Sequence, residues 1–128
     1  MAATTRRGGF TLIELLVVLA IIGTLLTIAL PKYLHSVARS KEAVLHQDLR
    51  VMRSAIDQFF ADTGRYPEAL DDLVAKRYLR SVPEDPETGS AATWVSVAPP
   101  EGVASAGIYD VRSGADGLSM EGTAYAQW

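Results

Sequence analysis

Cysteine is absent from this chain of 128 residues, and histidine occurs only twice. Without cysteine there can be no disulfide, no thiol catalysis and no thiolate metal site. His35 and His46 are three helical turns apart, roughly 16 Å, so they cannot bind one metal ion and we expect both to be solvated. The chain also lacks the common nucleophile, phosphate-loop and metalloprotease motifs, and we therefore do not expect an enzyme.

Charge is almost missing between Phe10 and Leu30, where Glu14 is the only charged residue. A helix of about 21 residues is close to 30 Å long, which matches the hydrocarbon core of a bilayer. Residues 10–30 are therefore predicted to form a transmembrane helix. A carboxylate in an apolar span is costly and needs a partner, so Glu14 is a candidate functional residue.

Two arginines, Arg6 and Arg7, precede this apolar stretch. Basic residues followed by an apolar run are typical of a membrane-insertion signal. A cleavable secretory signal has an apolar core of about 7–15 residues with a small-residue cleavage site after it, whereas this run is longer and has no such site. A plain membrane anchor would not explain Glu14.

The junction between the basic and apolar segments resembles the processing site of type IV pilins and type II secretion pseudopilins. The resemblance rests on the string Gly9-Phe10-Thr11-Leu12-Ile13-Glu14. It implies that residues 1–9 are a leader, that a prepilin peptidase cleaves between Gly9 and Phe10, and that the Phe10 amine is N-methylated. In an assembled filament, Glu14 is expected to pair with the Phe10 amine of a neighbouring subunit. Before assembly, it is expected to pair with the amine of its own chain or with a platform protein.

Pro31 comes directly after the apolar stretch, where it either ends the membrane helix or kinks it. We favour a kink, aided by Gly23, because the helical pattern continues after Pro31. Residues 31–62 are predicted to be the second half of the helix. Gly64 is expected to end it, because glycine is the usual residue just after a helix C-terminus. Apolar residues recur there at alternating spacings of four and three, which indicates one buried helix face. They are Leu45, Leu49, Met52, Ile56 and Phe59. The charged residues off this face, including Glu42 and Arg53, are expected to be solvated.

Residues 63–128 read as a small globular region with a C-terminal loop. A short helix is predicted at 71–79 and strands at 94–97 and 108–111, separated by proline- and glycine-rich turns. The expected fold class is therefore α+β. It is a type IV pilin-like arrangement, with a long N-terminal helix that is transmembrane in its first half and a small C-terminal antiparallel sheet domain.

Landmarks in this second half resemble the G-type major pseudopilin. In order, they are Gly64-Arg65-Tyr66-Pro67, residues 82–86, Tyr109-Asp110, residues 113–117 and Gly122-Thr123. The resemblance implies a structural subunit of the type II secretion pseudopilus, a piston-like filament that drives export of folded proteins across the outer membrane. The alternative is a type IV pilus pilin or minor pilin, which acts in adhesion, motility or DNA uptake. A non-assembling membrane-anchored binding module would not need Glu14.

Calcium is the one cofactor that this resemblance raises, because many G-type subunits bind it through consecutive aspartates after the Gly-Thr pair. Here Ala124 and Tyr125 follow Thr123. Calcium takes six to eight oxygens, and only Asp116 and Glu121 are weak candidates to supply carboxylates. We therefore expect no metal, with Trp128 packing over this loop instead.

The resemblance further implies partners and a location. The protein would be a single-pass inner-membrane protein with a periplasmic C-terminal domain. It would be processed by the prepilin peptidase, meet an inner-membrane assembly platform and minor pseudopilins, and self-assemble into a helical filament. Loss of Arg6 and Arg7 with the leader leaves 10 basic against 15 acidic residues, or −5, which does not favour nucleic-acid binding.

Overall fold

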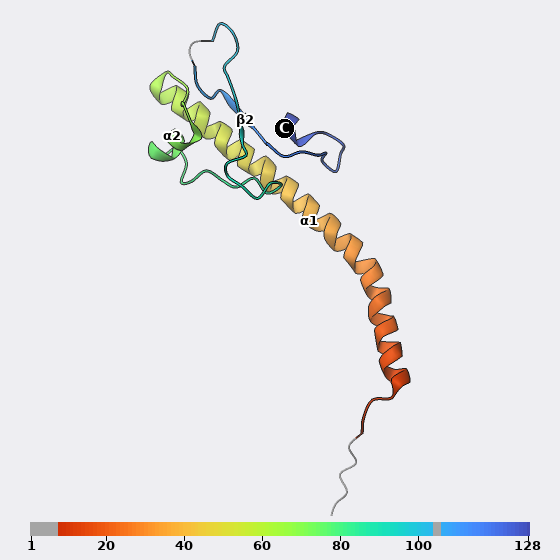
Figure 1. The fold of residues 1–128 in the computed structure, drawn as a ribbon. Helices are drawn as coiled ribbons and strands as arrows, with labels where there is room; N and C mark the ends of the chain where they lie inside the picture. Colours follow the sequence, from red (N-terminus) through yellow and green to blue (C-terminus); the bar gives the residue numbers. More distant parts are fainter. Residues whose placement is uncertain (1–7, 104–105) are drawn as a thin grey trace, which may run out of the picture. The chain divides into compact units, whose positions relative to one another are not determined.

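The computed structural model describes residues 8–103 and 106–128, so Arg6 and Arg7 of the expected leader lie outside the described residues. The chain divides into two compact units, residues 1–37 and residues 38–128. The elements are labelled in Figure 1 where there is room. In chain order they are α1 (Leu12–Thr63), α2 (Leu70–Ala75), β1 (Val95–Val97), β2 (Asp110–Arg112) and the 3-10 helix η1 (Tyr125–Gln127).

Helix α1 contributes to both units and continues without interruption for 52 residues, with Pro31 inside it. The prediction that the helix continues past Pro31 is confirmed, and the interpretation in which Pro31 ends it is wrong. The hydroxyls of Thr24 and Thr27 donate to main-chain carbonyls four residues earlier, each at 2.8 Å. These bonds satisfy both hydroxyls inside an apolar segment. A kink around Gly23 and Pro31 stays a prediction for the isolated subunit, and a break in the helix there stays a prediction for the assembled filament.

The core of the second unit lies along one face of α1. All five residues of the predicted face are at most 2% exposed, and Ala55 extends it. The side chains that pack against this face come from α2, the sheet and the loops: Tyr66, Leu73, Leu79, Trp94, Ile108, Val111, Ala115 and Tyr125. Figure 1 shows α2 and β2 beside this part of α1. Because the domain is small, the helix supplies much of its core.

Gly64 ends α1 as predicted, with φ at +72° and its N–H donating to the carbonyl of Phe60 at 2.8 Å. Glycine is favoured at such a left-handed position because it has no Cβ. Helix α2 begins one residue before the predicted start and is shorter than predicted. Its start is capped by Asp72, whose carboxylate accepts hydrogen bonds from the N–H groups of Glu68 and Ala69 at 3.0 and 3.2 Å.

Strands β1 and β2 form a two-stranded antiparallel sheet in which Ser96 lies opposite Val111. Both strands are confirmed, displaced from the predicted ranges by one or two residues. Val111 is fully buried, and Trp94, just before β1, is also buried and donates its indole N–H to the carbonyl of Pro83 at 2.8 Å. The α+β class is confirmed.

Candidate functional site

The first unit begins with a capping box formed by Thr11 and Glu14. The Thr11 N–H donates to Oε2 of Glu14 at 2.9 Å, and the Glu14 N–H donates to Oγ1 of Thr11 at 3.1 Å. These two bonds satisfy donors that the first turn of a helix otherwise leaves free. Glu14 is a candidate functional residue from the sequence, but this contact was not predicted, although a Thr-x-x-Glu spacing before an apolar run is its known signal.

Gly9 and Phe10 lie immediately before the capping box and are exposed, Phe10 to 92%. A Cβ at Gly9 would meet no atom within 4 Å, so packing within this chain does not require glycine there. The peptide bond between the two residues is therefore accessible.

The apolar residues of α1 that follow pack against no other part of the chain that the structure describes. Most of the large side chains between positions 12 and 30 are about half exposed or more. In the part of the chain that the structure describes, α1 is the only helix long and apolar enough to cross a membrane. A continuous apolar surface of this kind has to be covered by lipid or by neighbouring helices.

In the second unit, the weak calcium candidates Asp116 and Glu121 are both exposed. The segment between them is closed by its own hydrogen bonds, including Ser119 N–H to the Thr123 carbonyl at 2.7 Å and Ser119 Oγ to Thr123 Oγ1 at 2.8 Å. Within residues 8–103 and 106–128, no group of three or more His, Asp or Glu side chains is placed to hold a metal. The two candidates thus have no third carboxylate beside them.

Trp128 packs over this C-terminal segment, as predicted. Its ring stacks on His46 of α1, with centroids 3.9 Å apart and planes 9° apart, and meets Tyr125 edge-on at 5.2 Å. Its indole N–H donates to Oγ1 of Thr123 at 3.0 Å. His46 is exposed, as expected, but its stacking on Trp128 was not predicted.

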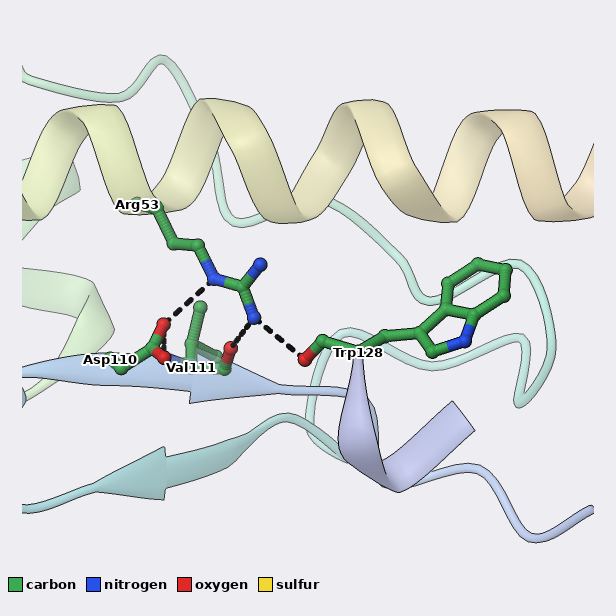
Figure 2. A network of polar contacts seen from close by, with 4 residues as sticks. All are labelled: Arg53, Asp110, Val111 and Trp128. Atoms are coloured by element: carbon green, nitrogen blue, oxygen red, sulfur yellow. Dashed lines mark hydrogen bonds and ion pairs between the residues drawn. The ribbon is translucent and has the colours of Figure 1, made fainter. Parts of the chain in front are cut away.

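The guanidinium of Arg53 joins α1 to two other segments. Its Nε donates to Oδ1 of Asp110 at 2.7 Å, and its Nη2 donates to the main-chain oxygens of Val111 at 3.0 Å and Trp128 at 2.7 Å. Figure 2 shows these three bonds. The expectation that Arg53 is solvated was wrong, because its acceptors lie more than fifty residues away and give no local signal.

Glu42 is a second contact of α1 that was expected to be solvated. One carboxylate oxygen accepts hydrogen bonds from the Tyr125 hydroxyl at 3.0 Å and from the Met120 N–H at 2.7 Å. The pKa of Tyr125 is raised to about 12, first by burial and then by the hydrogen bond to Glu42. Glu42, His46 and Arg53 together hold the C-terminal segment against α1.

Asp85, in the loop between α2 and β1, is a fully buried carboxylate. It accepts hydrogen bonds from the Ser113 hydroxyl and, at 2.9 Å, from the Glu87 N–H. Burial raises the pKa of the Asp48 carboxyl, and the negative charge of Asp85 raises it further. These contacts are those of a structural turn rather than of a catalytic site.

The sequence of this chain matches one family model and several known proteins. Residues 4–30 match the model of the prokaryotic N-terminal methylation motif. The chain is 40% identical over 68 residues to the type IV major pilin protein PilA of Myxococcus xanthus. The aligned residues are 53% of this chain and 31% of that protein. It is 29% identical over 97 residues to the type II secretion system core protein G of Aeromonas hydrophila, covering 63% and 68%. The corresponding protein of Pectobacterium carotovorum is 30% identical over 97 residues, covering 63% and 62%. No solved structure matches the chain significantly.

The methylation motif, the long apolar helix and the small α+β domain define a membrane-anchored, pilin-like protein. The chain is similar to type IV pilins and to type II secretion pseudopilins. The alignment spans about a third of the Myxococcus pilin and about two thirds of the Aeromonas protein.

Proposed function

We propose that this protein is a structural subunit of the type II secretion pseudopilus. The observation that carries the proposal is at the N-terminus, where an accessible Gly9–Phe10 bond precedes a capped apolar segment of α1. This segment, residues 12–30, has one carboxylate and no packing partner among the described residues. A helix with these properties is suited to storage in a bilayer and then to packing against copies of itself.

The capping box gives Glu14 a defined state before assembly. One carboxylate oxygen is held by the Thr11 N–H, while Oε1 makes no hydrogen bond to any described residue. The helix N-terminus also favours a negative charge, which lowers the cost of the carboxylate near the membrane. In the filament, this second carboxylate oxygen of Glu14 pairs with the methylated Phe10 amine of a neighbouring subunit. This pairing compensates two charges in an apolar surrounding and sets the stagger between subunits.

The remaining features of the proposal follow from this role. The prepilin peptidase removes residues 1–9, and the mature subunit waits in the inner membrane with its C-terminal domain in the periplasm. An assembly platform and minor pseudopilins nucleate the filament, whose growth drives folded proteins through the outer membrane. The role of the subunit is structural and not enzymatic. It holds no metal, because Asp116 and Glu121 supply too few oxygens for calcium.

A type IV pilin or minor pilin is the second candidate. It is favoured by the 40% identity to the Myxococcus pilin, which spans 68 residues. The similarity to core protein G supports the pseudopilin because it covers a larger share of this chain and a larger share of the relative.

Deletion of the gene in its native host distinguishes the two candidates. We expect folded exoproteins to accumulate in the periplasm, with surface pili and twitching unaffected, and we expect the wild-type gene but not Glu14→Leu to restore export. Loss of pili or twitching with normal export would instead identify a pilin.

A further inference from the structure

A hollow of about 430 Å³ lies beside the start of α2 in the second unit. Four larger apolar side chains line it: Leu70, Val82, Trp94 and Ile108. Two exposed carboxylates, Glu68 and Asp71, also line it. Neither carboxylate forms an ion pair, because the only ion pair among the described residues is the one between Arg53 and Asp110. The hollow is therefore lined by both apolar and acidic side chains, and no basic side chain lines it.

The other end of α2 carries the opposite charge. Lys76, Arg77 and Arg80 are all exposed there, and none of them is paired among the described residues. Arg77 has φ at +65° and is the only residue other than glycine with a positive φ in the described part of the chain. This left-handed position after a helix is one that glycine fits best, so the local backbone does not favour an arginine.

The acidic hollow and this basic corner, residues 76–80, cannot neutralise each other within one molecule. They lie at opposite ends of α2, whose six residues are about 9 Å long. The structure records no contact between the two groups of charges in the described chain. Each is therefore accessible to a group of opposite charge on another molecule.

We propose that the acidic hollow receives the basic corner of a second copy of this protein. The aliphatic stem of an arginine or lysine covers the apolar lining, and its charged head meets Glu68 and Asp71. The two complementary surfaces are different patches of the same chain, so the contact is head-to-tail. Contacts of this type repeat along an open helical assembly unless the rotation closes a ring.

This inference rests on the proposed function and adds a contact between the globular domains of neighbouring subunits. That contact is separate from the packing of the apolar helices and from the pairing of Glu14. Because it joins exposed charges, it contributes specificity and register more than raw affinity.

Charge reversal in the full-length protein, expressed in its native host, tests the contact. Glu68→Lys with Asp71→Lys reverses the hollow, and Lys76→Glu with Arg77→Glu and Arg80→Glu reverses the corner. Each set should lower the yield of sedimented filaments by about tenfold, since like charges then face each other across the contact. All five substitutions in one chain should restore most of the yield. Glu101→Lys and Arg65→Glu, at exposed positions outside both patches, are the matched controls.

Arg77→Gly separates assembly from folding. Glycine relieves the left-handed backbone, so the domain should be at least as resistant to heat and protease as the parent. Its filament yield should nevertheless fall. Unchanged yield for Arg77→Gly and for both reversed sets would overturn the inference.

A cross-linking measurement locates the contact directly, because the chain has no cysteine of its own. Filaments of a chain with Asp71→Cys and Arg77→Cys should give a ladder of multimers with a short thiol-specific cross-linker. Filaments with Asp71→Cys and Glu101→Cys should not. The absence of a ladder from the first chain would contradict the contact. A loss of filaments with the reversed hollow but not with the reversed corner would also contradict it, because the hollow would then bind another occupant. If the wild-type protein forms no filament at all, the proposed function itself fails.

Discussion

Arg53 on α1 and Asp110 on β2 are 57 residues apart in sequence, and their side chains meet at 2.7 Å. The same guanidinium also donates to the main-chain oxygens of Val111 and Trp128, so one side chain connects the helix, the sheet and the C-terminal segment. A small domain without disulfides has few other ways to hold its termini in place.

Arg53→Met should lower the free energy of unfolding of the soluble domain by about 1–3 kcal/mol, since charge-assisted hydrogen bonds are lost while the aliphatic stem is kept. Chemical denaturation of a fragment that lacks residues 1–34 measures this. Arg50→Met, at an exposed neighbouring position on α1, is the control and should change little. Equal stability of the two variants would mean that the Arg53 contacts contribute nothing.

Processing should occur between Gly9 and Phe10, with a methyl group added to the Phe10 amine. The measurement is the intact mass of protein purified from its native membrane. Gly9→Val should leave an unprocessed precursor in the membrane, and Gly8→Val, one residue away, should not. Since neither glycine is packed against other residues, both variants keep the fold. Any other mature start would contradict this prediction.

Glu14→Leu should give a processed subunit that inserts well but forms few filaments. The substitution removes the cost of a carboxylate in the membrane, yet it leaves the neighbour's amine without a partner, which is costly when buried. Thr11→Val is the matched control, because it removes the hydroxyl of the capping box and keeps the Glu14 carboxylate. We expect it to retain more assembly than Glu14→Leu, and normal filament yield for Glu14→Leu would exclude the pairing role.

The C-terminal segment should be held by packing, with no contribution from calcium. Calcium at 100 times its dissociation constant would add about 2.7 kcal/mol, a shift in melting temperature on the order of ten degrees. We expect no shift between excess calcium and chelator. Trp128→Ala should cost about 1–3 kcal/mol through its two aromatic contacts, whereas Gln127→Ala should cost little. A calcium-dependent shift abolished by Asp116→Ala would overturn this view.

The stability of the soluble domain should fall between about pH 10 and pH 12. The pKa of Tyr125 is about 12 in the folded domain, against an ordinary value near 10, so the folded form retains the proton in this window and the unfolded form loses it. The stabilisation by the neutral phenol is complete below pH 10 and disappears as pH rises through 12. Tyr125→Phe should be less stable by about 1 kcal/mol at neutral pH and should lose part of this slope. Tyr109→Phe, at an exposed position, is the control, and an equal slope in all three proteins would contradict the assignment.

The buried face of α1 could be read from the sequence because it depends on local periodicity. Leu45 and Phe59 are fourteen residues apart, yet the helical repeat alone puts them on one side. Gly64 ended the helix as expected because its left-handed conformation is a property of that residue. The strands were found to within two residues, where pairing rather than propensity decides the ends.

The polar contacts of the second unit could not be read in the same way. Glu42, His46 and Arg53 look like ordinary solvated side chains on a helix face, and their partners come from residues 110–128. The Thr11–Glu14 capping box differs, because its spacing is local and was available in the sequence.

The sequence by itself determined the membrane helix, its single carboxylate, the motif that ends at Glu14 and the core face of α1. Each of these depends on neighbours within a few turns, where composition and periodicity leave few choices. The tertiary structure decided which charges on α1 are structural, how Trp128 closes the C-terminal segment, and that an acidic hollow and a basic corner lie at opposite ends of α2. Those features depend on which distant segments the chain brings together, and such pairings are set by the packing of the whole domain.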